Sequence, residues 1–140
     1  MLDIEPHLKA MYEKASLKYK TDYEIILWAI ADDALLKRRS ADIYSSYVRI
    51  MRSMRSIKED PLSRETFNQR RNALKKPAHA SIVRANRQGW YEFTEAVVRG
   101  YVRLRAEDRG VQLGNDHPLD AKNPNALANL PQANIFRSRD

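Results

Sequence analysis

The stretch LSRETFNQRRNALKKPAHASIVRANRQGWYEF, residues 62–93, decides the fold. Ser63 is placed to N-cap a helix, because its hydroxyl can accept a hydrogen bond from the first free backbone N–H groups. Leu62 and Phe67 have the spacing of a hydrophobic staple around that cap. Pro77 ends the helix. A polar helix of about 14 residues is therefore predicted.

Beyond the proline the spacing of apolar residues changes from helical to two. With a period of two, Ile82 and Arg84 lie opposite Val83 and Ala85, which is typical of a strand. In the same way, Trp90, Glu92 and Thr94 lie opposite Tyr91 and Phe93. The loop Asn86-Arg87-Gln88-Gly89 between them is short and contains a glycine. This pattern predicts a β-hairpin directly after the polar helix.

Three further helices are predicted upstream. Residues 4–19 have one apolar stripe, residues 22–36 are apolar on nearly every side through Ala31, and Ser40 can cap a third helix with Ile43, Tyr47 and Ile50 on one face. Together with the hairpin, these helices predict a mostly α fold with a small β-hairpin, in the order of a winged helix-turn-helix.

The expected core contains the residues that recur at the proper period in each element. These are Tyr23, Ile26, Ile30, Ile43, Tyr47, Ile50, Phe67, Leu74, Ile82, Tyr91 and Phe93.

The rest of the chain completes the organisation. Residues 96–108 return to helical spacing, although interior Gly100 leaves a strand as the alternative. We expect a linking amphipathic helix over 1–20, a winged-helix domain over 21–108 and a flexible tail over 109–140, where apolar residues are too few at any fixed period for a core. The alternative for the tail is docking as an extended peptide through Leu127, Leu130, Ile135 and Phe136.

Composition restricts the class of protein. The chain of 140 residues is long enough for one domain, its longest apolar run spans residues 25–31, and it contains no cysteine. This predicts no membrane segment, no disulfide framework and a cytoplasmic protein.

Charge points to an anionic partner. The formal net charge is +7, and residues 37–87 carry fourteen basic and four acidic side chains. Such a basic middle favours nucleic acid, while the alternative is a solvated basic surface.

Residues suited to catalysis are not apparent. His7, His79 and His117 fall on different predicted elements, and no nucleophile motif or phosphate-binding glycine loop occurs. We expect neither an enzyme nor a cofactor or metal site.

Candidate DNA contacts lie on the polar helix and the hairpin. Amide side chains can pair with adenine edges, and arginine or lysine suits guanine edges and phosphates. The alternatives are an ordinary polar helix face and, for the hairpin, solubilising charges on an edge strand. The candidates are Arg64, Asn68, Gln69, Asn72, Lys75 and Lys76 on the helix, and Arg84, Arg87 and Gln88 on the hairpin.

The core positions also carry a family resemblance. They are the segments Tyr23 to Ala31, Ala41-Asp42-Ile43-Tyr44, Phe67 to Leu74, Ile82-Val83, Trp90-Tyr91-Glu92-Phe93 and Tyr101-Val102. Over about residues 10–105 the chain resembles the C-terminal winged-helix domain of AAA+ ATPases of the origin-recognition and STAND-like types. The resemblance implies a DNA-contacting or regulatory module attached to an ATPase.

The ATPase itself has no counterpart in the sequence, which lacks a Walker motif. The chain is then either part of a longer ATPase or a free-standing relative, and we expect the former, because it opens directly into the helix that would link such a domain to its lid. Double-stranded DNA is the expected partner, together with an ATPase domain in the same parent protein. The alternative function is a protein-protein interaction or regulatory module that uses the same winged-helix face.

Overall fold

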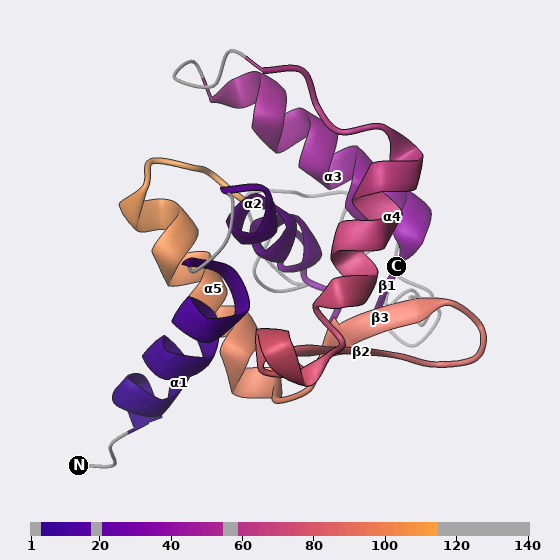
Figure 1. The fold of residues 1–140 in the computed structure, drawn as a ribbon. Helices are drawn as coiled ribbons and strands as arrows, with labels where there is room; N and C mark the ends of the chain where they lie inside the picture. Colours follow the sequence, from indigo (N-terminus) through magenta and orange to yellow (C-terminus); the bar gives the residue numbers. More distant parts are fainter. Residues whose placement is uncertain (1–3, 18–20, 55–58, 115–140) are drawn as a thin grey trace, which may run out of the picture.

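The computed structural model describes residues 4–17, 21–54 and 59–114, which form helices around one small antiparallel sheet (Figure 1). The elements in chain order are α1 (Ile4–Tyr12), a π-helical turn (Glu13–Leu17), α2 (Thr21–Ile30), β1 (Arg38–Arg39), α3 (Ser40–Ser53), α4 (Arg64–Ala73), a 3-10 helix (Pro77–His79), β2 (Val83–Ala85), β3 (Trp90–Phe93) and α5 (Ala96–Asp108). The predicted fold class, mostly α with a small hairpin in winged-helix order, is confirmed. The strand alternative for residues 96–108 is wrong.

Helix α2 is the centre of the core. Every side chain from Ile25 to Ala31 is at most 2% exposed. Figure 1 shows α2 in the middle of the molecule, between α1 and α5 on one side and α3 and α4 on the other. An apolar surface all around a helix requires such burial on every side. None of the helices in the described residues has the length and apolarity needed to cross a bilayer.

Ten of the eleven predicted core side chains are buried, and Tyr23 is the exception. Tyr23 lies in the first turn of α2 and is half-buried, with its ring centroid 4.6 Å from that of His79. The core also contains Leu8, Tyr12 and Val102, which were not on the predicted list.

The sheet has a third strand that the sequence did not reveal. β1 pairs antiparallel with β3, with Arg38 opposite Tyr91, and β3 pairs in turn with β2, so the order is β1-β3-β2. The segment around Arg38 looked like a break between helices, because two residues are too few to show a period of two. Through β1 the hairpin is attached to the start of α3.

The linking helix predicted over residues 1–20 belongs to the core in its described part. The Tyr12 hydroxyl donates to Glu24 Oε2 at 2.6 Å and accepts from Trp28 Nε1 at 3.0 Å, and all three residues are buried. Arg109 Nη1 lies 3.2 Å from the other Glu24 oxygen. The boundary predicted between residues 20 and 21 therefore does not separate two units, since one polar network spans it.

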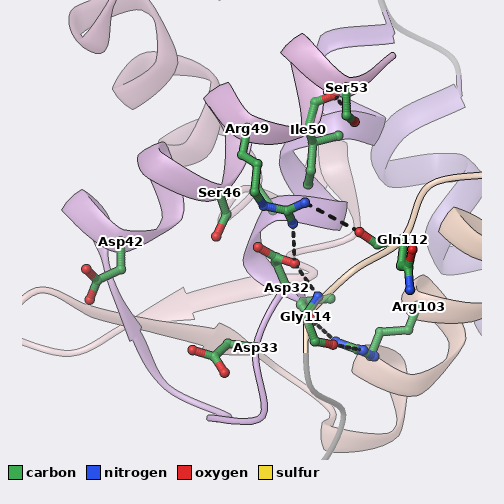
Figure 2. Close-up of polar contacts among 12 residues, drawn as sticks. Asp32, Asp33, Asp42, Ser46, Arg49, Ile50, Ser53, Arg103, Gln112 and Gly114 are labelled. Atoms are coloured by element: carbon green, nitrogen blue, oxygen red, sulfur yellow. Dashed lines mark hydrogen bonds and ion pairs between the residues drawn. The ribbon is translucent and has the colours of Figure 1, made fainter. Parts of the chain in front are cut away.

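The tail predicted from residue 109 starts with a docked segment. Val111 is 4% exposed, and the Gly114 N–H donates to Asp32 Oδ1 at 2.7 Å. The same carboxylate oxygen accepts from Arg49 Nη2 at 2.7 Å, and Arg103 Nη2 donates to the Gly114 carbonyl (Figure 2). Residues 109–114 thus pack on the domain, a correction to the predicted boundary. The alternative docking through Leu127, Leu130, Ile135 and Phe136, like the rest of the predicted tail, concerns residues 115–140, outside the described part.

Candidate nucleic-acid interface

Local chemistry positions α4 as the sequence predicts. The Ser63 side chain caps the helix by accepting from the Thr66 N–H at 3.2 Å. After Ala73 the chain continues in one turn of shorter-range hydrogen bonds, with the Lys76 N–H donating to the Ala73 carbonyl at 3.0 Å. The helix thus ends at Ala73, and the residues up to Lys76, which were predicted to be helical, form a turn in which Lys76 is already extended.

Contacts with α3 hold α4 by its apolar side. Phe67 is fully buried, with its ring centroid 5.0 Å from that of Tyr44 and 5.1 Å from that of Tyr47. The backbone of Leu62 is held by the same two tyrosines, since its carbonyl accepts from Tyr44 Oη at 2.7 Å and its N–H donates to Tyr47 Oη at 3.0 Å. This junction fixes the angle between the two helices, so the opposite side of α4 is left to solvent.

Four of the predicted contacts are exposed, two on α4 and two in the turn that follows it. Arg64, Gln69, Lys75 and Lys76 are exposed. The Arg64 guanidinium lies 5.3 Å from the Tyr44 ring centroid, which orients it beside the helix N-terminus. Together these side chains form a polar, mainly cationic surface.

Asn68 and Asn72 differ from these four, because both are half-buried and both contact Arg71. Arg71 Nη1 donates to Asn68 Oδ1 at 3.0 Å, and Arg71 Nη2 donates to Asn72 Oδ1 at 3.2 Å. Nη1 also donates to Ser40 Oγ. The two asparagines are therefore held by a third residue of the same helix.

Arg71 itself is buried against the sheet. It is 5% exposed, and its guanidinium lies 4.2 Å from the centroid of the Tyr91 ring. Burial lowers the pKa of Arg71 from the usual arginine value, because the charged form loses hydration. Arg71 was not among the predicted contacts, although the spacing Asn68, Arg71, Asn72, at i, i+3 and i+4, places the three on one helix face.

The three candidate DNA contacts on the hairpin have different surroundings. Arg87 and Gln88 are exposed in the loop, which the Asn86 side chain closes by accepting from the Gln88 N–H at 2.9 Å and the Trp90 N–H at 3.0 Å. Arg84 is exposed but lies opposite Glu92 in the ladder and pairs with its carboxylate at 3.1 Å. Arg84 is thus partly neutralised, whereas Arg87 forms no ion pair with any residue in the described part of the chain.

Several arginines that contribute to the net charge bind backbone carbonyls of the fold and not the surface. Arg38 Nη1 donates to the Ala29 carbonyl and Arg103 Nη1 to the Ala31 carbonyl, both at 2.7 Å, and Arg99 donates to the Asp33 carbonyl. These carbonyls belong to the end of α2 and the loop after it, where cations complement the negative end of the helix dipole. The basic surface is consequently smaller than the net charge suggests.

A pocket of about 430 Å³ lies beside β1 and the first half of α3. It combines acidic and basic side chains, and the Arg38 guanidinium in it is already bound to the end of α2 and to Ser46 Oγ at 3.1 Å. Its lining consists of Asp33, Leu35, Lys37, Arg38, Asp42, Ser45, Ser46, Arg49 and Trp90. This mixture favours no single class of ligand.

Metal-binding geometry is absent from the residues that the structure describes, where no three His, Cys, Asp or Glu side chains gather. His79 is buried with Nδ1 2.7 Å from the Ala15 carbonyl, and His7 lies 3.4 Å from Glu95. His117 lies outside the described residues. The two described histidines thus have structural partners.

Comparisons with protein-family models, curated proteins and solved structures find no match for this chain. The surface of α4 and the hairpin is therefore the basis for assigning a function.

Proposed function

We propose that this chain is a non-catalytic double-stranded DNA-binding module, in which α4 enters the major groove and the hairpin loop contacts the backbone. One observation carries the proposal. The apolar side of α4 is fixed to α3 by Phe67, and the exposed residues are Arg64 and Gln69 on the helix and Lys75 and Lys76 in the turn that follows it. Phosphate contacts position such a helix, and polar side chains on it reach base edges.

The hairpin supports the same orientation. The loop between β2 and β3 extends away from the helices beside the C-terminal end of α4 (Figure 1). Arg87 in this loop is exposed and would meet phosphate next to the groove that α4 occupies. In line with the family resemblance, the parent protein in this proposal is an AAA+ or STAND-type ATPase.

The salt dependence of duplex binding tests the proposal. Arg64, Lys75, Lys76 and Arg87 are exposed and have no ion pair within the described residues. Four phosphate contacts predict a log-log slope of affinity against salt of about −3.6, measured by fluorescence anisotropy on mixed-sequence duplexes.

A matched pair of variants locates the contact. Arg87→Ala should flatten the slope by about 0.9 and weaken binding to all sequences alike. Lys9→Ala removes one exposed charge from α1, away from α4 and the hairpin (Figure 1), and should leave the slope unchanged. Equal effects of the two substitutions, or no binding at low salt, would overturn the proposal.

A second candidate function is contact with another protein, such as an ATPase domain. Val97 and Leu104 lie seven residues apart on α5 and are 50% and 61% exposed, an apolar surface that DNA would not use. If duplex binding fails while Leu104→Ser abolishes binding to the ATPase region of the parent protein, this candidate replaces the first.

A further inference from the structure

The contacts of Arg71 determine how the side-chain amides of Asn68 and Asn72 are oriented. A guanidinium has five N–H donors and no acceptor. The group that each asparagine presents to Arg71 must therefore be its Oδ1 oxygen and not its amide nitrogen. Ser40 supports this assignment for Asn68, because its hydroxyl accepts from Arg71 and donates to Asn68 Oδ1 at 3.4 Å.

The nitrogen atoms of the two amides are left for a partner. Asn68 and Asn72 are half-buried, so part of each side chain remains accessible. They lie one turn apart, toward the surface that carries Gln69 and Lys76. Each thus offers N–H donors, with its oxygen turned toward Arg71.

We propose that Arg71 is a positioning residue that makes Asn68 and Asn72 read hydrogen-bond acceptors in the major groove, with guanine favoured over thymine because it offers two acceptors, N7 and O6, against the single O4. The inference rests on the proposed DNA-binding function. An asparagine that reads adenine needs its oxygen for the N6 amino group and its nitrogen for N7. Guanine presents only acceptors, N7 and O6, along this part of its edge, and it therefore matches an amide whose oxygen is already engaged.

Gln69 lies on the same helix but, unlike Asn68 and Asn72, is not held by Arg71. It is exposed and makes no hydrogen bond to Arg71, so both of its amide atoms remain available for adenine. The expected site contains two guanines one or two base pairs apart, because four residues of helix span about 6 Å and base pairs rise about 3.4 Å.

Isosteric variants of the full chain test the orientation. Asn68→Asp and Asn72→Asp keep an oxygen toward Arg71 and gain an ion pair with it, so folding should persist. The outward nitrogen becomes an oxygen, which accepts from the N4 amino group of cytosine. Each variant should therefore change the preferred base at one position from guanine to cytosine, whereas a merely structural role would leave base preference unchanged.

The probe is a duplex selected by the wild-type chain from a randomised pool. Replacing each selected guanine by 7-deazaguanine removes the N7 acceptor and should weaken wild-type binding about fivefold, the size of one hydrogen bond. Gln69→Glu is the control for the added charge, and it should lower affinity without altering the two guanine positions.

The outcomes separate this inference from the proposed function. Guanine preference that disappears in Asn68→Asp and Asn72→Asp supports it. Wild-type binding with adenine at these positions, or with a preference that the two variants leave unchanged, overturns it while DNA binding stands. No binding of the wild type to any duplex at low salt overturns both.

Discussion

Tyr12→Phe tests whether α1 belongs to the folded domain. The substitution removes one hydroxyl and leaves the ring in place. That hydroxyl serves two buried partners, the Glu24 carboxylate at 2.6 Å and Trp28 Nε1 at 3.0 Å. Glu24 then keeps its ion pair with Arg109, whose Nη1 lies 3.2 Å from the other carboxylate oxygen.

The expected loss of stability is the sum of the costs of leaving two buried polar atoms, Glu24 Oε2 and Trp28 Nε1, without the Tyr12 hydroxyl. Each costs about 1–3 kcal/mol, so Tyr12→Phe should lower the free energy of unfolding by about 2–6 kcal/mol. For a domain of about 100 residues this corresponds to a fall in Tm of roughly 8–24 °C. Urea unfolding measures the change, and the slope m should stay constant, because the surface exposed on unfolding is the same.

Tyr101→Phe is the matched control. Tyr101 is half-buried, and its hydroxyl accepts from Arg105 at 3.2 Å. Its loss should cost about 1 kcal/mol or less. If Tyr12→Phe costs no more than this control, or if the α1 amides exchange with solvent at a free energy far below that of global unfolding, then α1 is a separate element and our reasoning is wrong.

Three further predictions concern stability. Phe67→Ala should cost about 3–5 kcal/mol in urea unfolding, because the ring is fully buried; a loss below about 1 kcal/mol would contradict its place in the core. Gly114→Ala should cost about 1–3 kcal/mol, since the new Cβ would lie 2.8 Å from the Asp32 carbonyl oxygen, and an unchanged stability would show that residues 109–114 do not dock. Burial raises the pKa of both Tyr12 and Tyr47, so the folded state holds these phenolic protons more tightly than the unfolded chain. The resulting stability is complete below about pH 10 and decreases above it, which unfolding at about pH 9 and about pH 11 would measure; ionisation of every tyrosine near pH 10 in the folded protein would contradict it.

The structural features that could be predicted depend on residues that lie close together in the sequence. Ser63 caps α4 because cap and first turn are adjacent, and Phe67 and Leu74 are buried because a spacing of seven places them on one helix face. The hairpin follows from a period of two on either side of a glycine loop. These signals predicted the fold class and the helix that presents the candidate DNA contacts. DNA binding itself stays a prediction.

Tertiary structure decided where the charged and polar side chains point. Composition does not distinguish Arg87, which is exposed on the hairpin loop, from Arg38, which is buried against the end of α2. Nor could it show that Arg71 lies on Tyr91 of a distant strand while holding Asn68 by its oxygen. A long flexible side chain reaches partners far away in sequence, and its direction depends on which carbonyls, carboxylates and rings the fold brings within a hydrogen bond of it.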